Sequence, residues 1–454
     1  MSFSQSIEIV PLKRPPQVAV SVPGSKSITN RALVLAALKA KGYVQAIRGA
    51  LRSEDTEIMV ECLRTLGFRI LTEWHEQAIF VSSGLDEPTI PADSATLFVG
   101  NSGTTMRFLT AMVSLGHGRY RLDGVPRMRE RPIEDLLVAL RQLGVHAYSE
   151  KNNGCPPVIV EARGLAGGHV NIKGDLSSQF LTGLLLAAPY ADDLMDVEID
   201  GSLVSRPYVD MTLRMLRHWG HTVVETDAGF RFLPDGGNED ELVQRRIDAA
   251  AFHDGFDPRH HTLLEDYCIE PDASAASYFL AAAAISGGRV TVLDLPANSL
   301  QGDVAFVDVL ADMGCRVERC SSGITVHGRP LRGIDVDMNG ISDTVMTLGA
   351  VACFADGPTT IRNVGHIRHK ETDRLSALAT ELRRIGAEVE EFTDGLTITP
   401  GPLHGAEIET YNDHRMAMSL ALVGLNVPGI VIKDPRCVGK TYPEFFRDLE
   451  RLRE

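Results

Sequence analysis

Lysine, serine and arginine side chains stand at the beginning of the first expected helix, where they can bind an anion. The stretch Val22-Pro-Gly-Ser-Lys-Ser-Ile-Thr-Asn-Arg-Ala-Leu33 runs from a loop into an apolar-rich helical segment that should end near Gly42. Lys26, Ser27 and Arg31 then lie in the first turns, beside unpaired N–H groups and the positive dipole end that favour a phosphate. A capped helix with solvated charges explains this stretch alone equally well. The anion-binding interpretation therefore depends on whether the same helix start recurs along the chain.

The same kind of helix start recurs along the chain. Each copy begins with small polar residues, continues through Ala and Leu, and leads into a short β-like piece. If the copies pack symmetrically, their N-termini can face one cleft suited to a small, multiply charged ligand. The residues at these starts are Lys26/Ser27/Arg31, Asn101/Gly103/Thr104/Arg107, Ser177/Ser178/Gln179, Asp272/Ser274, Asp343 and Asn412/Asp413/His414/Arg415.

Further basic stretches occur next to expected strands. Pro126–Pro132 holds three arginines, whose fixed fork suits carboxylate or phosphate. Arg368–Arg374 should open a helix with Lys370 and Arg374 on one face and Glu371 beside them. A carboxylate held among cations can have its protonation tuned for acid–base work, although surface ion pairs would leave the same pattern. Asp434–Lys440 offers another cation in a loop.

Two alternating helix types position these residues. The first type is expected at Ser25–Gly42, Asn101–Gly116, Ser177–Ala191, Asp272–Gly288, Asp343–Gly357 and Asn412–Gly424. Strands should follow at Val44–Ile47, Tyr120–Leu122, Val197–Ile199, Val290–Leu293, Thr359–Ile361 and Ile430–Ile432. The second type is amphipathic and is expected at Ile58–Gly67, Leu136–Gly144, Met211–Gly220, Phe306–Gly314, Ala377–Gly386 and Phe445–Arg453. The chain is therefore predicted to hold six β/α units, three in each of two domains.

Composition narrows the function classes. The chain has 454 residues, 44% hydrophobic and 23% charged, as in an ordinary globular protein of two or more domains. Its net charge of −15 argues against a general nucleic-acid binder. The 7 cysteines form no CxxC pair, and the start of the chain lacks an apolar signal core. These features predict a cytoplasmic protein with reduced thiols.

Common cofactor and nucleophile motifs do not match. A P-loop, a GxGxxG fingerprint, a GxSxG elbow and an HExxH pair are all missing from the sequence. A His-rich insertion between residues 230 and 270 contains His253, His260 and His261, which could bind a metal, but a solvated loop is the expected reading. The chemistry is therefore predicted to be acid–base, with anions held by Lys, Arg and helix ends and with no metal or cofactor.

Nine motifs in order resemble the 5-enolpyruvylshikimate-3-phosphate (EPSP) synthase family, from about Val18 onward. They are Pro23-Gly-Ser-Lys-Ser27 with Asn30-Arg-Ala-Leu33, Gly100-Asn-Ser-Gly-Thr104 with Met106-Arg107, Pro126–Pro132, Ser177-Ser-Gln-Phe180, Ser205-Arg-Pro-Tyr208, Asp272-Ala-Ser274 with Ser277-Tyr-Phe279, Lys370-Glu-Thr-Asp-Arg374, Asn412-Asp-His-Arg-Met416 and Asp434–Lys440. The resemblance implies an α/β fold of the inside-out barrel type, with two similar domains, each of three repeated β/α units, hinged around a central cleft. The domains would comprise residues 25–268, with most of the shikimate 3-phosphate site, and residues 1–24 with 269–454.

The resemblance implies an enzyme that transfers the enolpyruvyl group of phosphoenolpyruvate (PEP) to the 5-hydroxyl of shikimate 3-phosphate. Phosphate is released through a tetrahedral intermediate, in the pathway to aromatic amino acids. No cofactor, nucleic acid or membrane partner is implied, and the family default is a monomer. The alternative is an enolpyruvyl transferase for another acceptor, either a shikimate-like secondary metabolite or UDP-N-acetylglucosamine. The latter family uses a Cys in the loop that corresponds to Pro126–Pro132, where this chain has none.

Site residues follow from the resemblance, motif by motif. Catalytic roles fall to Asp343 (substrate hydroxyl), Glu371 (PEP methylene), Lys26 and His414. The shikimate 3-phosphate site would include Lys26, Ser27, Arg31, Ser177, Ser178, Gln179, Ser205, Tyr208, Asp343, His366 and Lys370. The PEP site would include Lys26, Asn101, Gly103, Arg127, Gln179, Arg374, Arg415 and Lys440.

Two positions depart from the family pattern. His366 stands where the family often has Asn, and Phe108 stands where Pro is common. Gly103 lies, by resemblance, where the herbicide glyphosate competes with PEP. Because a Cβ there would crowd glyphosate, the glycine predicts sensitivity to it.

Overall fold

The computed structural model describes residues 5–39, 44–83, 89–233 and 266–454, and it divides into two compact units. The continuous unit is Ser27–Ile269, and the discontinuous unit combines Met1–Lys26 with Glu270–Glu454. These divisions stand next to those expected after residues 24 and 268. Lys26 therefore belongs to the discontinuous unit, whereas Ser27 and Arg31 belong to the other.

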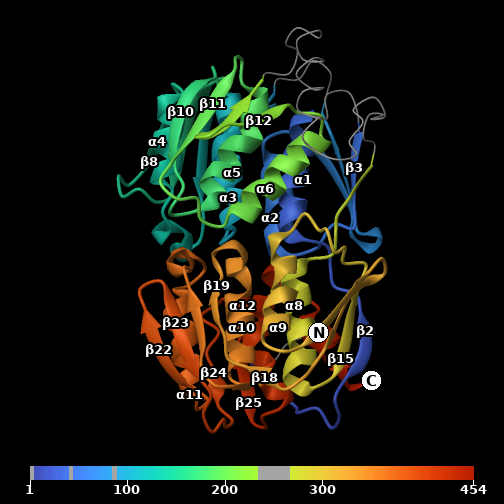
Figure 1. The fold of residues 1–454 in the computed structure, drawn as a ribbon. Coiled ribbons are helices and arrows are strands. Elements are labelled where there is room, and N and C mark those ends of the chain that lie inside the picture. Colours follow the sequence, from blue (N-terminus) through green and yellow to red (C-terminus); the bar gives the residue numbers. More distant parts are fainter. Residues whose placement is uncertain (1–4, 40–43, 84–88, 234–265) are drawn as a thin grey trace. The chain divides into compact units, whose positions relative to one another are not determined.

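The elements of the continuous unit follow each other as repeats. Its strands are β3 (Val44–Arg48), β4 (Arg69–Glu73), β5 (Ala78–Ser82), β6 (Ser94–Phe98), β7 (His117–Asp123), β8 (His146–Ser149), β9 (Val158–Arg163), β10 (Gly168–Lys173), β11 (Met195–Asp200), β12 (Val223–Glu225), β13 (Gly229–Phe232) and β14 (Asp266–Cys268). The helices are α1 (Lys26–Lys39), which starts at the boundary, α2 (Glu54–Thr65), α3 (Gly103–Met112), α4 (Glu134–Gln142), α5 (Ser178–Ala187) and α6 (Arg206–His218) (Figure 1).

The discontinuous unit has corresponding elements. Its strands are β1 (Ser6–Ile9), β2 (Gln17–Val20), β15 (Arg289–Leu293), β16 (Arg316–Cys320), β17 (Gly323–His327), β18 (Leu331–Arg332), β19 (Asp335–Asp337), β20 (Ala355–Asp356), β21 (Thr359–Arg362), β22 (Glu388–Phe392), β23 (Gly395–Thr399), β24 (Glu407–Ile408) and β25 (Ile430–Lys433). Its α-helices are α8 (Ala273–Ser286), α9 (Phe306–Asp312), α10 (Val345–Ala352), α11 (Arg374–Arg384), α12 (His414–Ala421) and α13 (Phe445–Glu450). Short 3-10 helices include η7 (Asn339–Thr344), η8 (Gly365–His369) and η10 (Pro435–Lys440).

One sheet pattern recurs in the repeats. A strand pairs in parallel with the strand that follows the first helix. The second helix then leads into an antiparallel hairpin, whose last strand pairs antiparallel with that second strand, as in the order β6-β7-β9-β8. The orders β10-β11-β13-β12 and β19-β21-β23-β22 repeat this arrangement. This confirms the α/β class and the repeated units that the sequence predicts.

An exchange of strands makes one unit discontinuous. β2, which precedes α1, pairs in parallel with β15, and β14, which precedes α8, pairs in parallel with β3. The two connecting segments run side by side, because the Ser25 N–H donates to the Glu270 carbonyl at 2.8 Å and the Asp272 N–H to the Pro23 carbonyl at 2.8 Å. The start of α1 is thereby fixed to the start of α8.

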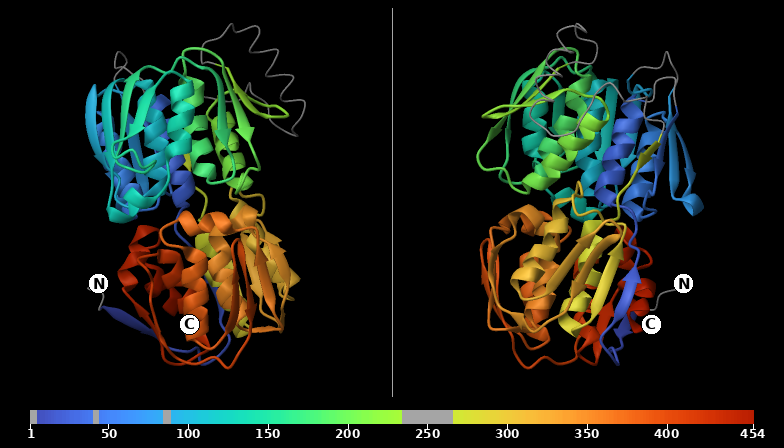
Figure 2. Two further views of the ribbon diagram at one scale, coloured as in Figure 1. Left: turned by 90° about the vertical axis from the view of Figure 1, so that its left-hand side faces the viewer. Right: turned by 45° about the vertical axis from the view of Figure 1, so that its right-hand side comes forward.

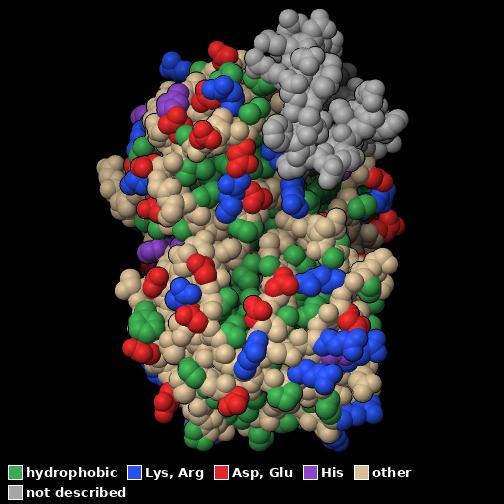
Figure 3. Space-filling view, in the orientation of Figure 1, with side chains coloured by type: hydrophobic (Ala, Val, Ile, Leu, Met, Phe, Trp, Pro, Cys, Tyr) green, Lys and Arg blue, Asp and Glu red, His purple; other side chains and the backbone are tan. Residues whose placement is uncertain are grey.

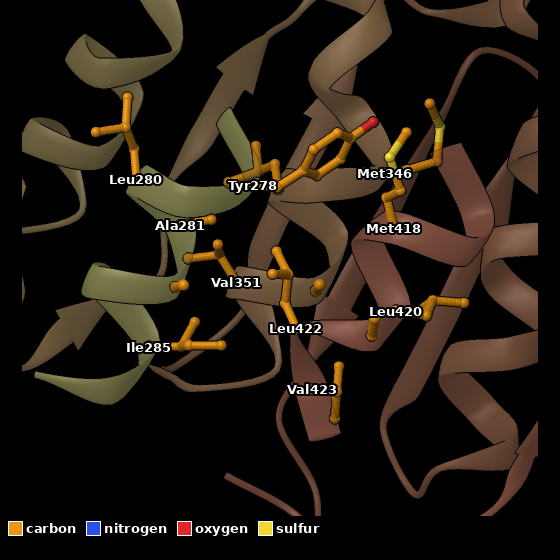
Figure 4. Close-up of a cluster of buried hydrophobic side chains, with 14 of the residues drawn as sticks. Tyr278, Leu280, Ala281, Ile285, Met346, Val351, Met418, Leu420, Leu422 and Val423 are labelled. Atoms are coloured by element: carbon orange, nitrogen blue, oxygen red, sulfur yellow. The ribbon is translucent and has the colours of Figure 1, made fainter. Parts of the chain in front are cut away.

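The first helix of each repeat is buried on nearly all sides. In α10 every residue is buried, and α8 is buried from Ala275 to Ile285. Helices without a polar face lie in a protein interior, whereas amphipathic helices such as α11 cover a surface. Figures 1 and 2 show helices gathered inside each unit with sheets around them. Figure 4 shows Tyr278 of α8, Val351 of α10 and Leu422 next to α12 in this core.

The expected ends of the second helix in each repeat are confirmed where the structure describes them, whereas α10 ends at Ala352, before the expected Gly357. The glycines that follow the second helix of each repeat, Gly67, Gly144, Gly220, Gly314 and Gly386, have φ of +96°, +81°, +92°, +115° and +102°. A left-handed residue stops a helix, and glycine adopts that conformation without a Cβ penalty. The expected end of the first helix at Gly42 lies outside the described residues.

One expected helix begins later than predicted. Asp343 was expected to open a helix, but it lies in η7, and α10 begins at Val345. Ile341 has non-helical dihedral angles within η7, which separates this segment from a regular helix. Asp343 is consequently presented from a short irregular segment.

Candidate active site

Arg374 is the centre of an ion-pair cluster in the discontinuous unit. Its side chain is 1% exposed. Nε donates to Asp413 Oδ2 at 2.8 Å, Nη2 to Glu371 Oε2 at 2.8 Å and Nη1 to Asp343 Oδ1 at 3.2 Å. Burial alone would lower the pKa of Arg374, but Asp413, Glu371 and Asp343 together raise it above its ordinary value. The guanidinium is therefore charged and held in one orientation.

Asp343 joins this cluster to further cations. Arg415 Nη2 donates to Asp343 Oδ2 at 2.7 Å, and Lys370 Nζ lies 3.8 Å from Oδ1. Burial raises the pKa of Asp343, but Arg415, followed by Lys370, Arg374 and Lys26, holds it well below its usual range. The carboxyl group is thus ionised and a weak base in this state.

Glu371 is the second carboxylate with a candidate acid–base role. It is 9% exposed, and its other oxygen, Oε1, lies 4.0 Å from Nζ of the buried Lys440. Lys440 ends η10, the segment after β25. Glu371 is thus placed between a guanidinium and an ammonium group, as the expectation of a carboxylate among cations requires.

The expected position of Lys370 is wrong. The sequence spacing predicts Lys370 and Arg374 on one helix face, but η8 ends at His369 and α11 begins only at Arg374. Asp373 is the N-cap of α11 and accepts a hydrogen bond from the Ser376 N–H at 3.1 Å. Because an N-cap ends the preceding non-helical chain, Lys370 and Glu371 lie in a connecting segment.

The start of α12 adds a capping carboxylate and an imidazole. Asp413 is fully buried, and its Oδ1 accepts the Arg415 N–H at 2.9 Å while the same carboxylate holds Arg374. His414 is 1% exposed, and burial, followed by the charge of Arg415, lowers its pKa well below the ordinary value. The imidazole is therefore neutral, and neither ring nitrogen has a hydrogen-bond partner among the described residues.

Lys26 approaches the cluster from the start of α1. Its backbone N–H donates to Asp272 Oδ2 at 3.2 Å, and Asp272 caps α8 by accepting the Ala275 N–H at 2.8 Å. Ser274 in the first turn of α8 accepts a hydrogen bond from Arg415 Nη2 at 3.4 Å. The polar starts of α8, α11 and α12, the η7 segment and Lys26 at the start of α1 thus lie within one unit.

His366 lies in η8, next to this segment. It is 9% exposed, and burial, followed by the charge of Lys370, lowers the pKa of His366 to about 3. The ring is therefore neutral near pH 7.

Arg31 is the corresponding buried cation of the continuous unit. Its Nε donates to Thr212 Oγ1 at 2.8 Å, and its other nitrogens donate to the carbonyls of Ser27 and Tyr208 at 2.8 and 3.1 Å. The guanidinium carbon lies 5.2 Å from the centre of the Phe108 ring. Burial lowers the pKa of Arg31 to about 10. The hydrogen bonds of Arg31 thus go to a hydroxyl group and two carbonyl groups, which do not neutralise its charge.

A second arginine of the continuous unit lies beside Gly103. Arg131 is 3% exposed, and its Nη1 donates to the Asn101 carbonyl at 3.1 Å. A Cβ on Gly103 would stand 2.5 Å from Arg131 Nη2 and 3.1 Å from Gln179 Oε1. The expected residues Asn101, Gly103 and Gln179 are therefore close together, and the glycine leaves room for a guanidinium of the protein itself.

The other expected residues of this unit occupy helix ends. Ser177 caps α5 and accepts the Gln179 N–H at 3.3 Å, and Ser178 in the first turn is buried. Ser205 precedes α6 with a φ of +54° and is buried. Arg127 is paired with Glu130 at 2.9 Å.

The sequence placed Asp413 at a helix start and Arg131 within Pro126–Pro132, but it gave neither of them, nor Thr212, a role in holding the expected residues. Asp413 orients Arg374, Thr212 orients Arg31, and Arg131 lies against Asn101. Asp413 and Arg131 stand within motifs of the sequence, and their capping or charged chemistry is a usable signal. Thr212 carries no such signal, because its partner Arg31 is remote in sequence.

Some expectations concern other features of the chain. His253, His260 and His261 lie outside the described residues. Within residues 5–39, 44–83, 89–233 and 266–454, no three His, Cys, Asp or Glu side chains are grouped to hold a metal. Over the same ranges, none of the helices has the length and apolarity needed to cross a bilayer. The face drawn in Figure 3 carries both acidic and basic side chains on each unit, whereas Arg374 and Arg415 are buried.

The repeated β/α units carry a buried cluster of cations and carboxylates, an arrangement typical of enzyme sites for small, multiply charged anions. The family model described as EPSP synthase (3-phosphoshikimate 1-carboxyvinyltransferase) matches residues 14–251 and 256–449. A 3-phosphoshikimate 1-carboxyvinyltransferase of Nostoc punctiforme is 48% identical over 443 residues, which are 97% of either chain. One of Shewanella oneidensis is 44% identical over 435 residues, which are 96% of either chain.

Solved structures agree with this relationship. An EPSP synthase from Acinetobacter baumannii superposes with a TM-score of 0.77 at 25% identity, covering 98% of this chain and 97% of the other. The enolpyruvyl transferase NikO from Streptomyces tendae, 20% identical with a TM-score of 0.73 over 98% of this chain and 97% of the other, shares the fold. The chain belongs to the EPSP synthase family, 3-phosphoshikimate 1-carboxyvinyltransferase.

Proposed function

We propose that this protein transfers the enolpyruvyl group of PEP to the 5-hydroxyl of shikimate 3-phosphate and releases phosphate, in the pathway to aromatic amino acids. Family membership supports the reaction. The observation that supports a site around Arg374 is the cluster there, in which five basic side chains lie near three carboxylates. The basic residues are Lys26, Lys370, Arg374, Arg415 and Lys440, and the carboxylates are Asp343, Glu371 and Asp413. Such an excess of cations suits substrates that bring phosphates and carboxylates.

The substrate charges are divided among residues of each unit. In the discontinuous unit, Lys26, Arg374, Arg415 and Lys440 hold PEP, and Lys26, Asp343, His366 and Lys370 contact shikimate 3-phosphate. In the continuous unit, the residues assigned to PEP are Asn101, Gly103, Arg127 and Gln179. Those assigned to shikimate 3-phosphate there are Ser27, Arg31, Ser177, Ser178, Gln179, Ser205 and Tyr208.

The reaction needs one proton removed and one supplied. Asp343 takes the proton of the 5-hydroxyl while that oxygen bonds to C2 of PEP, and Glu371 protonates the methylene carbon. The C2–O bond to phosphate then breaks, and the departing phosphate takes up the proton held by Asp343. The methyl group returns a proton to Glu371, which restores the double bond and regenerates both carboxyl groups. Lys26 assists with the charge, and His414, as a neutral imidazole, assists with proton handling.

The ligand-free electrostatics support a role for PEP in activating Asp343. Arg415, followed by Lys370 and Arg374, holds the pKa of Asp343 far below its usual range, so Asp343 is a poor base before PEP arrives. When the anionic groups of PEP share these two guanidinium groups, the pKa of Asp343 rises toward a working value. Substrate binding thus activates the base.

We further propose that the enzyme is a cytoplasmic monomer that needs no cofactor, nucleic acid or membrane, and that glyphosate competes with PEP. The test is phosphate release by the purified protein from PEP, with and without shikimate 3-phosphate, in the absence of added metal. Release that requires both substrates supports the proposal, and added glyphosate should suppress it. Release only with UDP-N-acetylglucosamine as the acceptor would contradict it.

A further inference from the structure

The turn before α12 has an unusual backbone conformation. Tyr411 and Asn412 both have positive φ, +55° and +51°, and the Asp413 N–H donates to the Thr410 carbonyl at 2.8 Å. Two positive φ values within such a hydrogen-bonded turn are the pattern of a type I′ turn, whose central positions favour Gly, Asn and Asp. Asn412 fits this preference, but a bulky Tyr411 is strained there.

Tyr411 has a side-chain partner that accounts for its presence in the turn. Its hydroxyl donates to Glu381 Oε1 at 2.7 Å, and Glu381 Oε2 accepts the Glu409 N–H at 3.2 Å. Glu381 belongs to α11 and is 0% exposed, with Arg384 Nε 3.4 Å from Oε2. The buried carboxylate of Glu381 therefore binds the backbone just before the turn, at Glu409, and binds the turn itself through the Tyr411 hydroxyl.

The phenol is a lasting donor in this environment. Tyr411 is 40% exposed, but partial burial of its phenol, followed by the hydrogen bond to Glu381, raises the pKa of Tyr411 to about 12, against the opposing charge of Arg384. Glu409, the other nearby carboxylate, is paired with Lys433. The hydroxyl consequently stays protonated over the range in which an enzyme works.

The residue after the turn begins the candidate catalytic helix. Asp413 holds Arg374 through Nε at 2.8 Å and caps α12 through the Arg415 N–H at 2.9 Å. Arg415 in turn contacts Asp343 at 2.7 Å. The direction in which the chain leaves the turn at Asn412 therefore sets the place of the Asp413 carboxylate and of the two residues that follow.

We propose that Tyr411 and Glu381 are positioning residues, whose mutual hydrogen bond holds the left-handed turn and thereby places Asp413, His414 and Arg415. Neither residue belongs to the cluster around Arg374, and each acts through the backbone of the turn. A strained conformation persists only where its surroundings determine it, and here the buried carboxylate supplies that constraint. The catalytic consequence rests on the proposed function, whereas the mechanical one does not.

Hydrogen exchange tests the mechanical part without requiring turnover. Tyr411→Phe removes only the hydroxyl, so amide exchange in a peptide over residues 409–418 should accelerate about tenfold, since a hydrogen bond to a charged group is worth roughly that factor. Tyr120→Phe is the control for loss of a tyrosine hydroxyl elsewhere: Tyr120 is 0% exposed and its hydroxyl donates to the Ala92 carbonyl at 2.7 Å in the other unit. Unchanged exchange in Tyr411→Phe, or equal acceleration in Tyr120→Phe, would overturn the inference.

Kinetics tests the positioning part. Tyr411→Phe should lower kcat/KM for PEP about tenfold and leave KM for shikimate 3-phosphate within about twofold, because Arg374 and Arg415 are the residues displaced. Tyr411→Gly should recover part of the loss, since glycine adopts the turn without strain. Faster exchange with unchanged kinetics would refute the positioning role. If the wild-type protein were inactive but amide exchange were still faster in Tyr411→Phe, the proposed function would be contradicted. The anchoring of the turn by Tyr411 would then remain supported.

Discussion

His366 should make the stability of this protein depend on pH in a way that asparagine cannot. Burial, followed by the charge of Lys370, lowers the pKa of His366 to about 3, compared with about 6.5 in an unfolded chain. Between these values the unfolded chain binds a proton that the folded protein does not. The contribution of His366 to the free energy of unfolding therefore rises with pH across this window. This contribution is lost progressively as the pH falls below about 6.5.

The magnitude follows from the two pKa values. At pH 5 the unfolded histidine is almost fully protonated, one and a half units below its pKa, and the folded one is almost entirely neutral. At about 1.36 kcal/mol per unit, lowering the pH from 7 to 5 costs about 2 kcal/mol through this residue. His366→Asn removes this contribution because the amide does not titrate.

Urea unfolding of the wild type and of His366→Asn at pH 7 and pH 5 measures the effect. Taking the difference between the two proteins at each pH cancels the titration of all other groups, and this difference should shift by about 2 kcal/mol in favour of the variant at pH 5. His369→Asn is the control, since His369 is exposed three residues away and should behave as the wild type does. A shift below about 0.5 kcal/mol, or a His366 ring that titrates near 6.5 by NMR, would refute the reasoning.

Three other substitutions test the assigned roles. Gly103→Ala places a Cβ 2.5 Å from Arg131 Nη2, so Arg131 must move, and KM for PEP should rise together with the inhibition constant of glyphosate. Unchanged values of both constants would show that the Arg131 guanidinium moves aside without cost. Glu371→Gln should lower kcat at least about 100-fold, the usual contribution of a general acid, with PEP binding retained in a calorimetric titration; full turnover would remove Glu371 from the mechanism. Phe108→Leu removes the ring 5.2 Å from the Arg31 guanidinium, and KM for shikimate 3-phosphate should rise about threefold to tenfold. Equal increases in KM for shikimate 3-phosphate and for PEP would instead indicate a general loss of packing.

Much of the fold was predictable because its signals are local. Helix-closing glycines, apolar spacing and polar caps lie within a few residues of each other, and the repeated helices and strands are found close to their expected bounds. Local signals also explain the errors, because they predicted that the segments before α10 and α11 would be helical. A spacing of four residues between Lys370 and Arg374 suits a helix, and only the capping of α11 by Asp373 shows that the helix begins after Lys370.

The residue types of the candidate site were also predictable, since helix starts rich in Lys, Arg, Ser and Asp indicate an anion. Their partners were not. Asp413 and Asp343 are separated from Arg374 by 39 and 31 residues, yet both contact its guanidinium. Whether a carboxylate is a free base or one held ionised by cations depends on such distances and on burial, neither of which is local.

The sequence by itself determined the repeated β/α units, the polar helix starts and the family of this protein, because these depend on residue order and short spacing. Tertiary structure decided which charges meet, which of them are buried, and that a strained turn at Tyr411 is anchored to a carboxylate on another helix. Electrostatic energies depend steeply on separation and on exclusion of water. Both quantities are fixed only when helices remote in sequence pack against each other.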